Sequence, residues 1–192
     1  MAPATLSRLT ALVLVALPVA GCGVYDIPNL ETQAKATFAE VREQYRSRAE
    51  LVPKLVEAIG PIAAQEREAL AAVDQAFARA TGVKVEAGTV QDRDRFREYQ
   101  DTQNGLTGAL GRVFDAVERA PDLAADRNIV ALRTQIRASE DRAGAKLRDY
   151  NGVARAYNSE MRAFPSIFWA IIWGAKAMAV SDPPPEGGPR PA

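Results

Sequence analysis

The strongest constraint on the fold is an apolar seam that runs along residues 129–164. Apolar or small side chains recur there at alternating intervals of three and four, over about five heptads. Residues at this spacing share one face of an α-helix, so the pattern predicts a long helix that packs lengthwise against other helices. The seam consists of Ile129, Leu132, Ile136, Ser139, Ala143, Leu147, Tyr150, Ala154, Tyr157, Met161 and Phe164.

Two Tyr-Asn pairs, Tyr150-Asn151 and Tyr157-Asn158, lie seven residues apart within this seam. Seven residues turn an α-helix by about 700°, so both pairs lie on nearly the same face. Asparagine in a helix interior costs about 0.5–0.7 kcal/mol relative to alanine. Hydrogen-bond partners inside the fold would offset this cost, so we expect a buried polar arrangement that fixes one register.

A second apolar track with the same alternation covers residues 34–80, and a third covers residues 96–117. Pro53 and Gly60-Pro61 interrupt the second track. Proline lacks a backbone donor and clashes with the carbonyl four residues earlier, so the helix either bends or ends there. The phase of the track is unbroken across Gly60-Pro61, and this favours a bend.

The third track contains Gly105, Gly108 and Gly111, each of which weakens a helix by about 1 kcal/mol relative to alanine. These glycines either allow a close approach of another helix or mark a softer segment. Taken together, the three tracks predict an all-α fold. We expect an elongated antiparallel helical bundle of three to four long helices with coiled-coil-like heptad packing.

Residues 1–21 have the features of an export signal of the lipoprotein type. A short basic region ends at Arg8, and about 12 apolar residues follow, which rise only about 18 Å as a helix. This is too short to cross a bilayer core of about 30 Å. The run Val19-Ala20-Gly21-Cys22 resembles a bacterial lipobox and contains the only cysteine of the chain. The alternative is an ordinary cleaved signal followed by a free thiol.

The lipobox predicts that Cys22 is the lipid attachment site and the first residue of the mature protein. Buried acyl chains contribute about 0.8 kcal/mol per CH₂, so such an anchor is effectively permanent. Gly23 stands where lipoprotein sorting signals have Asp for retention at the inner membrane. We therefore expect a lipid anchor in the cell membrane or outer membrane, facing the periplasm, with residues 22–28 as the lipidated tether.

Residues 166–180 are nearly all apolar, with Trp169 and Trp173 and a single charge at Lys176. As a helix this segment would span about 22 Å, which is short for a membrane crossing. It either docks on the bundle or on a second copy, or lies in the membrane interface, where tryptophan is favoured. The predicted bundle covers residues 29–180, and the Pro- and Gly-rich residues 181–192 are expected to be disordered.

Four runs of sequence then point to a known family. They are QYRSRAELVPKLVEAIG at 44–60, NGLTGALGRV at 104–113, APDLAADRNIVALRTQI at 120–136, and SEDRAGAKLRDYNGVARAYNSEMRAFP at 139–165. In combination these runs resemble the LemA family. The resemblance implies a membrane-anchored, mostly helical bundle that faces away from the cytoplasm and has no established biochemical activity. Family members usually begin with a transmembrane helix, whereas this chain has a lipobox there, and Trp173-Gly174-Ala175 replaces the Gly-Phe ending of the family.

Two charged residues, Arg48 and Glu66, fall on the seam of the second track, where apolar residues are expected. They lie about 27 Å apart along one helix, so they cannot pair within it. Glu140 or the pair Tyr150-Asn151 is the expected partner of Arg48. A ligand site inside the bundle is one interpretation, and a structural polar layer that sets the register is the favoured one. The predicted layer comprises Arg48, Glu66, Glu140, Tyr150, Asn151, Tyr157 and Asn158.

Composition excludes much of the common enzyme chemistry. The chain has no histidine, so neither a Ser-His-Asp triad nor the Glu-x-x-His motif of di-iron bundles can be built. A single cysteine disfavours zinc, and no phosphate-binding glycine loop is present. The net charge of zero gives no nucleic-acid footprint. We expect no enzyme, and no catalytic residue, cofactor, metal or small-molecule substrate.

The resulting prediction is a non-enzymatic helical scaffold or interaction module of the bacterial cell envelope. Its expected partners are the membrane, through lipidated Cys22, and envelope proteins or further copies of itself. The alternative is a membrane-active protein that uses its apolar C-terminal segment to insert into and shape the bilayer.

Overall fold

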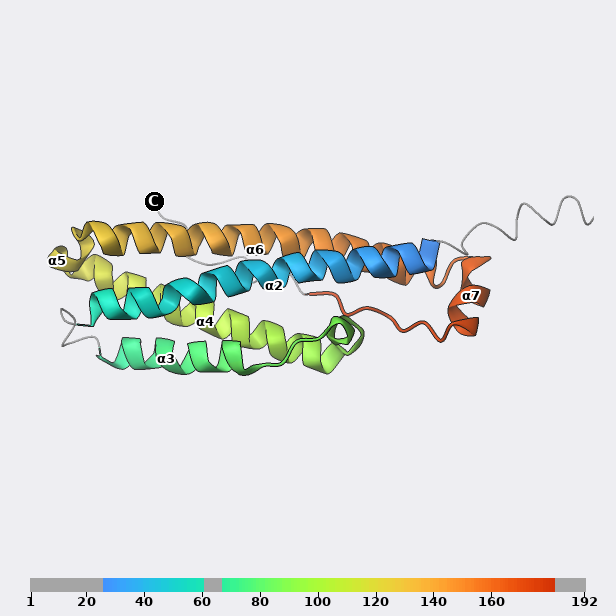
Figure 1. Ribbon diagram of the computed structural model, residues 1–192, viewed down its shortest axis with the longest axis horizontal. Coiled ribbons are helices and arrows are strands. Elements are labelled where there is room, and N and C mark those ends of the chain that lie inside the picture. The colour runs from blue at the N-terminus through green and yellow to red at the C-terminus, as the bar shows by residue number, and fades with distance from the viewer. Residues whose placement is uncertain (1–25, 61–66, 182–192) are drawn as a thin grey trace, which may run out of the picture.

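The computed structural model describes residues 26–60 and 67–181, and every regular element in these residues is a helix (Figure 1). The predicted all-α class is therefore confirmed for the described part of the chain. The elements are α2 (Asp26–Ile59), α3 (Arg67–Gly82), the 3₁₀ turn η1 (Ala87–Gln91), α4 (Arg93–Arg119), α5 (Pro121–Ala124), α6 (Arg127–Glu160) and α7 (Ser166–Ile172).

Helices α2 and α6 lie side by side and run in opposite directions. Each has 34 residues and is therefore about 51 Å long. Lys146 forms an ion pair with Glu40 at 2.7 Å, and the Arg142 Nε–H donates to Gln44 Oε1 at 3.0 Å. The higher residue number on α6 pairs with the lower residue number on α2, as expected for helices that run in opposite directions. Helices α3 and α4 lie next to each other along part of this length.

The second apolar track is divided between two helices. Helix α2 ends at Ile59, and α3 begins at Arg67 and runs back in the opposite direction. The expected bend at Gly60-Pro61 is therefore wrong, although α2 does continue through Pro53. Gly60 weakens a helix through its backbone freedom, and Pro61 adds the loss of a backbone donor, so the pair ends a helix that Pro53 alone does not end. Residues 61–66, including the predicted layer residue Glu66, lie outside the described residues.

Aspartate side chains fix the starts of the two later long helices. Asp92 precedes α4 and accepts hydrogen bonds from the backbone N–H groups of Asp94 and Arg95, both at 3.1 Å. Asp126 does the same for α6, with the N–H groups of Asn128 and Ile129 at 2.8 and 3.0 Å. An aspartate at this position satisfies backbone donors that have no partner within the helix.

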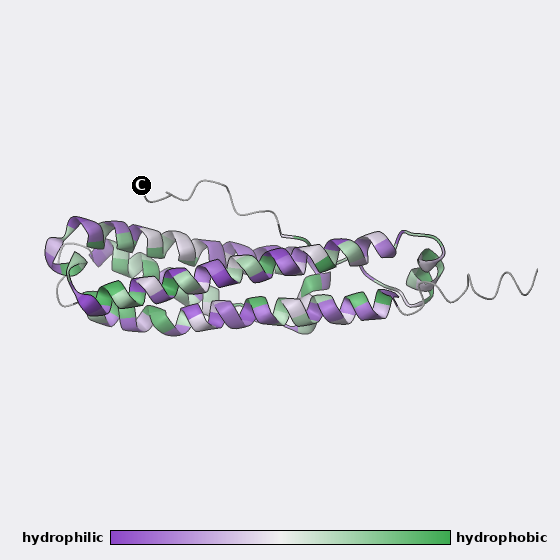
Figure 2. Cartoon of the chain, turned by 90° about the horizontal axis from the view of Figure 1, so that it is seen from above, coloured by the Kyte–Doolittle hydropathy of each residue, from purple (hydrophilic) through white to green (hydrophobic). Residues whose placement is uncertain are grey.

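Buried apolar side chains of residues 26–60 and 67–181 form two clusters, one toward each end of the elongated molecule. The cluster toward α5 contains Val52, Leu55, Ile59, Val73, Ala80, Leu106, Ala109, Leu110, Val113, Phe114, Val117, Leu123, Ile129, Leu132 and Ile136. The cluster toward α7 contains Ile27, Ala34, Phe38, Val41, Val90, Phe96, Tyr99, Tyr150, Ala154, Tyr157, Ala170, Met178 and Ala179. Along the long helices, hydrophilic and hydrophobic residues alternate, whereas α7 is almost wholly hydrophobic (Figure 2).

Helix α7 is shorter than the expected helix 166–180, because it ends at Ile172. Gly174 has φ = 59°, and its N–H donates to the Ile171 carbonyl at 3.1 Å. The Ala175 N–H donates to the Ala170 carbonyl at 2.9 Å. This pair of bonds forms a Schellman motif, which needs a left-handed residue that glycine supplies without steric cost.

Residues 175–181 are not helical and return from α7 toward the middle of the molecule. At the other end of the described chain, α2 begins at Asp26, so it includes residues 26–28 of the predicted tether. The predicted signal 1–21, the lipid site Cys22 and residues 182–192 of the predicted tail lie outside the described residues.

Candidate functional site

A buried arginine lies between the two apolar clusters. Arg48, in the middle of α2, is only 1% exposed. Its Nη1 donates to Thr107 Oγ1 at 2.5 Å and to Glu140 Oε1 at 3.2 Å. Its Nη2 donates to the side-chain and backbone oxygens of Gln103, at 2.7 and 3.3 Å. One guanidinium thus connects α2 with α4 and α6.

The same layer extends to α3 and to an aromatic ring. The Gln103 Nε2–H donates to the backbone carbonyl of Ala80 at 3.2 Å, in the last turn of α3, where carbonyls lack partners within the helix. The Arg48 guanidinium lies 5.1 Å from the centre of the Tyr45 ring, within cation–π range. We define the arginine layer as Arg48, Gln103, Thr107 and Glu140, and it contacts all four longer helices.

Burial dominates the protonation of the carboxyl group in this layer. Burial raises the pKa of Glu140 more than the charge of Arg48 and the hydrogen bonds from Thr107 and Arg48 lower it, so the net shift is upward. Burial also raises the pKa values of Tyr45 and Tyr99, which lie beside the layer. The desolvation cost of a buried ion pair roughly cancels its Coulomb attraction, so such a pair is weak support for stability and better support for specificity.

The arginine layer has few of the features of a reaction centre. It contains a single carboxyl group, which is bound by an arginine rather than placed opposite a second acid. Across residues 26–60 and 67–181, no group of three or more potential metal ligands comes together. The observed hydrogen bonds of Arg48 join α2 to α4 and α6.

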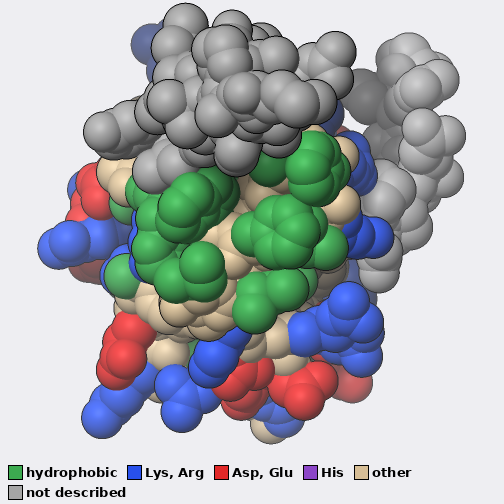
Figure 3. Space-filling view, turned by 90° about the vertical axis from the view of Figure 1, so that its right-hand side faces the viewer, with side chains coloured by type: hydrophobic (Ala, Val, Ile, Leu, Met, Phe, Trp, Pro, Cys, Tyr) green, Lys and Arg blue, Asp and Glu red, His purple; other side chains and the backbone are tan. Residues whose placement is uncertain are grey.

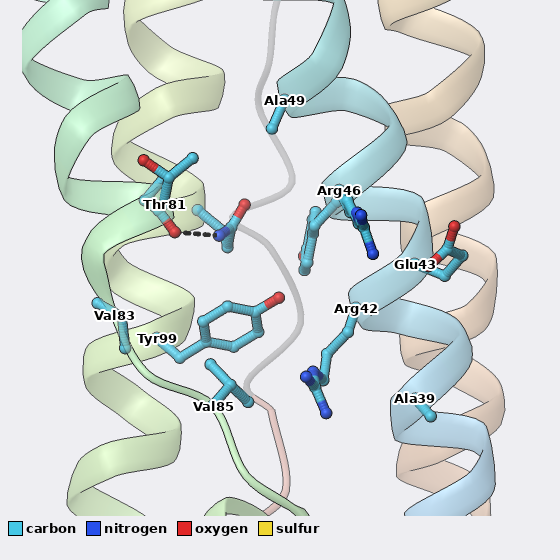
Figure 4. A pocket seen from close by; sticks show the side chains of 12 residues that line it. Ala39, Arg42, Glu43, Arg46, Ala49, Thr81, Val83, Val85 and Tyr99 are labelled. Atoms are coloured by element: carbon cyan, nitrogen blue, oxygen red, sulfur yellow. Dashed lines mark hydrogen bonds between the residues drawn. The ribbon is translucent and has the colours of Figure 1, made fainter.

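An open cleft of about 450 Å³ lies beside this layer, between α2 and the segment where α3 leads into η1 (Figure 4). Arg42 and Tyr99 point into the cleft from opposite sides. Gln103 contributes to the cleft wall and to the arginine layer at once. The cleft therefore opens from solvent toward the arginine layer.

Asn151 and Asn158 on α6 bind the backbone of the returning C-terminal segment. The Met178 N–H donates to Asn158 Oδ1, and the Asn158 Nδ2–H donates to the Met178 carbonyl, both at 2.8 Å. The Ser181 N–H donates to Asn151 Oδ1 at 2.9 Å, and the Asn151 Nδ2–H donates to the Ser181 carbonyl at 3.3 Å. Each side-chain amide thus pairs with both backbone groups of a single residue.

The spacing of the two asparagines matches the spacing of an extended chain. From Asn151 to Asn158 the helix rises about 10.5 Å. From Met178 to Ser181 a polyproline II backbone, in which every third residue faces the same way, advances about 9 Å. The segment runs antiparallel to α6, since Met178 lies at Asn158 and Ser181 at Asn151. The seven-residue spacing of the pairs therefore suits two contact points along one extended peptide.

Two further hydrogen bonds hold the residue between these contact points. The fully buried Tyr150 donates its hydroxyl proton to the Ala179 carbonyl at 2.6 Å. The Ala179 N–H donates to the Val90 carbonyl of η1 at 2.7 Å. We call Tyr150, Asn151 and Asn158 the Tyr-Asn clamp.

Packing fixes the tyrosines of both pairs. The rings of Phe38 and Phe96 lie 5.4 and 5.5 Å from the Tyr150 ring, and burial raises the pKa of the Tyr150 hydroxyl. Tyr157 is also fully buried. Burial raises the pKa of the Tyr157 hydroxyl, and the charge of Glu31 raises it further.

The structure separates residues that the sequence analysis placed in one layer. Arg48 meets Glu140, but Tyr150 and Asn151 lie in the cluster toward α7 and bind residues 179 and 181 instead. Sequence reasoning missed Thr107 and Val90, and neither has a local signal. Gln103 had one, because it is a polar residue on the apolar track of 96–117.

A patch of exposed apolar side chains covers the end of the molecule at α7. This is the end at which α2 begins, and the patch faces the viewer in Figure 3. We define the α7 patch as Phe164 (75% exposed), Ile167, Phe168, Ile171 (72% exposed), Ile172 and Trp173. Exposed patches of this kind mark contact sites for proteins or membranes. Among the described helices, none combines the length and the apolar character needed to cross a bilayer.

The sequence profile of the LemA family matches residues 37–184, a range that contains the arginine layer, the Tyr-Asn clamp and the segment it holds. The chain belongs to the LemA family. This LemA-family chain is also similar to the magnetosome proteins MamQ 1 and MamQ 2 of Paramagnetospirillum magneticum (strain ATCC 700264 / AMB-1). Each is 31% identical to it over 83 residues, which are 43% of this chain and 30% of the relative. The match thus spans less than a third of the length of these curated relatives.

Proposed function

We propose that this LemA-family protein is a lipid-anchored, non-enzymatic scaffold of the bacterial cell envelope. Cys22 would tie it to the cell membrane or outer membrane on the periplasmic side, and its helices would present their outer faces to envelope proteins or to further copies. The observation that carries this proposal is the use of the interior polar groups. Arg48, Asn151 and Asn158 all bind groups of this chain itself, Arg48 on neighbouring helices and the asparagines on residues 178 and 181, so their partners are polypeptide rather than a small molecule.

The scaffold would be a bundle with coiled-coil-like packing, in which antiparallel helices interlock along heptad seams. Burial of the α6 seam supports this part of the proposal. Eight of the eleven predicted seam residues are buried, namely Ile129, Leu132, Ile136, Ser139, Ala143, Tyr150, Ala154 and Tyr157. Leu147 and Met161 are half-buried, and Phe164, beyond the end of α6, is exposed. Such packing would give a stiff unit, because each seam residue is enclosed by neighbours on the facing helix.

Covalent geometry supports the position of the proposed anchor. Cys22 is four residues before Asp26, so at most about 14 Å of chain separates it from the start of α2. A lipid on Cys22 would hold this end of the molecule at the bilayer. Metabolic labelling of cells with a tagged fatty acid tests the anchor. We expect label on the full chain and none on the C22S variant, and an unlabelled wild-type chain would overturn the anchor.

Site-specific photo-crosslinking in living cells tests the scaffold role. A photoreactive residue at exposed Glu43 on α2 or at exposed Asp141 on α6 is expected to give discrete crosslinked bands in the envelope fraction. The same residue in place of buried Leu110 serves as the control and should give none. Absence of bands at every exposed position would contradict a scaffold.

The alternative is a membrane-active protein that uses α7. It is favoured by one observation, namely that the α7 patch lies at the end where α2 begins, within reach of the proposed anchor. Flotation of the unlipidated C22S chain with liposomes tests this alternative. Binding that the additional changes I171S and I172S abolish would support it, and absence of binding would argue against it.

A further inference from the structure

The Tyr-Asn clamp recognises its occupant through the backbone. Asn158 and Asn151 bind the N–H and C=O groups of Met178 and Ser181, and Tyr150 binds the carbonyl of Ala179. None of these five hydrogen bonds uses a side-chain atom of the occupant. Recognition of this kind resembles the addition of a strand to an open sheet edge, where main-chain hydrogen bonds supply affinity and side-chain pockets supply selectivity.

The side chains of the occupant add selectivity. Met178 is buried in the apolar cluster toward α7, and the small side chains of Ala179 and Ser181 are buried beside it. A peptide with a flexible apolar residue at its first position and small residues at its second and fourth positions therefore fits. Residues 178–181 of this chain meet that requirement in every copy.

The segment in the clamp belongs to an arm that leaves the bundle before it returns. Residues 161–165 form a turn after α6, α7 lies across the end of the molecule, and Gly174 then redirects the chain. The arm (residues 161–181) carries the α7 patch, which its own bundle leaves exposed. An element joined to its long helix through a turn and held by generic backbone contacts can be exchanged between identical chains at little cost.

We propose that the Tyr-Asn clamp is a peptide-binding site that also accepts residues 178–181 of a second copy of this chain, so that two copies exchange their arms. The same hydrogen bonds form in the exchanged and unexchanged forms. The equilibrium between these two forms therefore depends on the protein concentration and on contacts made by the α7 patch. This step rests on the proposed function in one respect. Anchoring through Cys22 would hold the arms of neighbouring copies at the same height above a membrane and raise their effective concentration.

Co-purification of two differently tagged full-length chains tests the exchange. The chains are co-expressed, extracted in a mild detergent and captured through one tag. We expect the wild-type chains to be captured together. The change Ala179→Pro in both copies removes the N–H that donates to the Val90 carbonyl, and it should reduce co-capture at least tenfold.

The matched control is Ala177→Pro, the same substitution at an exposed position of the same segment. It should leave co-capture within about twofold of wild type, because no clamp bond involves residue 177. Circular dichroism of each purified variant then checks that the helical content is unchanged. Equal co-capture for Ala179→Pro and wild type would overturn the proposal, as would wild-type chains that never co-purify.

A crossed pair separates exchange from a merely structural effect. One copy carries Ala179→Pro, which leaves its clamp intact, and the other carries N151A and N158A, which leave its arm intact. Together they still have one intact clamp and one intact arm. We therefore expect more co-capture between these two different variants than between two copies of either variant. No recovery would contradict arm exchange, because a general loss of folding gives no complementation.

The outcome is independent of the lipid anchor, because detergent replaces the membrane in this assay. Repeating the wild-type experiment with C22S in both chains should preserve co-capture. No fatty-acid label together with recovery in the crossed pair would disprove the anchor and support the exchange. Fatty-acid label without recovery in the crossed pair would support the anchor and disprove the exchange.

Discussion

Arg48 shows how one residue can determine which helices meet. Its guanidinium forms hydrogen bonds to Gln103, Thr107 and Glu140, and these bonds can form together only in one relative placement of α2, α4 and α6. Replacing this layer with apolar residues would remove a geometric requirement that the two apolar clusters alone do not impose. We interpret the layer as the element that sets the register of the bundle.

We predict that Arg48→Met lowers the free energy of unfolding by about 3–5 kcal/mol, because it leaves the Glu140 carboxyl and two further polar groups without their partner. Arg48→Lys should not restore stability, since one ammonium cannot reproduce the planar fork that reaches two helices. Urea unfolding followed by circular dichroism measures both effects.

The control for this prediction is Arg46→Met, two residues away on the same helix. The Arg46 side chain is 74% exposed, and its ion pair with Glu50 at 3.5 Å lies at the surface. Surface pairs of this type contribute about 0–1 kcal/mol. A loss for Arg46→Met as large as that for Arg48→Met would contradict a specific role of the arginine layer.

The raised pKa of Glu140 predicts a pH dependence of stability. The carboxyl group binds its proton more tightly in the folded state than in the unfolded state. Between the ordinary carboxyl range and the raised pKa, the folded state therefore holds more protons, and the stability contributed by Glu140 falls as pH rises. E140Q cannot titrate there, so the stability difference between wild type and E140Q should decrease across this window and stay constant above it.

Urea unfolding of the two proteins in matched buffers at several pH values measures this difference. A difference that grows with pH would mean that the Arg48 charge outweighs burial at the Glu140 carboxyl group, so that its pKa is lowered rather than raised.

At the residue scale, the sequence predicted Arg48 as a polar exception on a seam, and Glu140 as one of two candidate partners. It did not choose between them, because a heptad pattern gives the face of each helix but not how far one helix is shifted along another. Thr107 could not be predicted, since a threonine on the outer part of a helix carries no signal of a distant arginine. Glu66 lies outside the described residues and stays a prediction.

At the scale of single elements, the structure shows whether the glycines of α4 allow a close approach of another helix or mark a softer segment. A Cβ atom added at Gly105 or Gly111 would meet no atom within 4 Å, so neither glycine is needed for a close approach of another helix. Both positions instead weaken the helix through backbone freedom. We interpret this part of α4 as the softer segment that the sequence left open.

We predict that Gly105→Ala and Gly111→Ala each stabilise the protein by about 1 kcal/mol, because alanine reduces the conformational freedom of the unfolded chain. The melting temperature should rise by about 2–4 °C per substitution. Gly60→Ala is the contrasting case, since its Cβ would lie 3.2 Å from the Val56 carbonyl oxygen. Thermal unfolding of the three variants should therefore give two increases and no increase for Gly60→Ala, and a decrease at residue 105 or 111 would contradict the assignment.

The limits of sequence reasoning at this scale lie at the ends of elements. The period of the apolar track passes unchanged through Gly60-Pro61, because two helices that run in opposite directions can carry the same spacing. Helix α2 nevertheless ends at Ile59, and α3 runs back against it from Arg67. Hydropathy alone extended the last helix to residue 180, but Gly174 ends α7 and the Tyr-Asn clamp satisfies backbone groups of the non-helical segment after it. The asparagines were recognised as unusual, whereas backbone partners such as those of Met178 have no sequence signature.

At the scale of the whole molecule, the two ends differ in chemistry. No large apolar side chain of α5 is exposed, whereas the other end combines the start of α2 with the exposed α7 patch. Periodicity was sufficient to predict an all-α chain with long helices. Which elements share an end depends on tertiary packing, and both the proposed anchor and the alternative proposal of a membrane contact by α7 depend on this property.

The only two tryptophans of the chain can report whether the end at α7 contacts a membrane. Trp169 and Trp173 lie together at α7, with their ring centres 5.9 Å apart. If the lipid on Cys22 holds this end at the bilayer, we predict that tryptophan emission of the full-length protein in liposomes shifts to the blue and is quenched by lipids brominated in the upper acyl chain.

A variant with both tryptophans changed to phenylalanine and with Val130→Trp reports on the opposite end. Val130 is 47% exposed and lies near the start of α6, about 45 Å along the helix from its last residue. Its emission should resist the same brominated lipids, because a bundle attached by one end keeps the other end in water. Equal quenching at both positions would mean that the molecule lies flat on the bilayer. No quenching of the tryptophans at α7 would show that this end of the molecule does not contact the membrane.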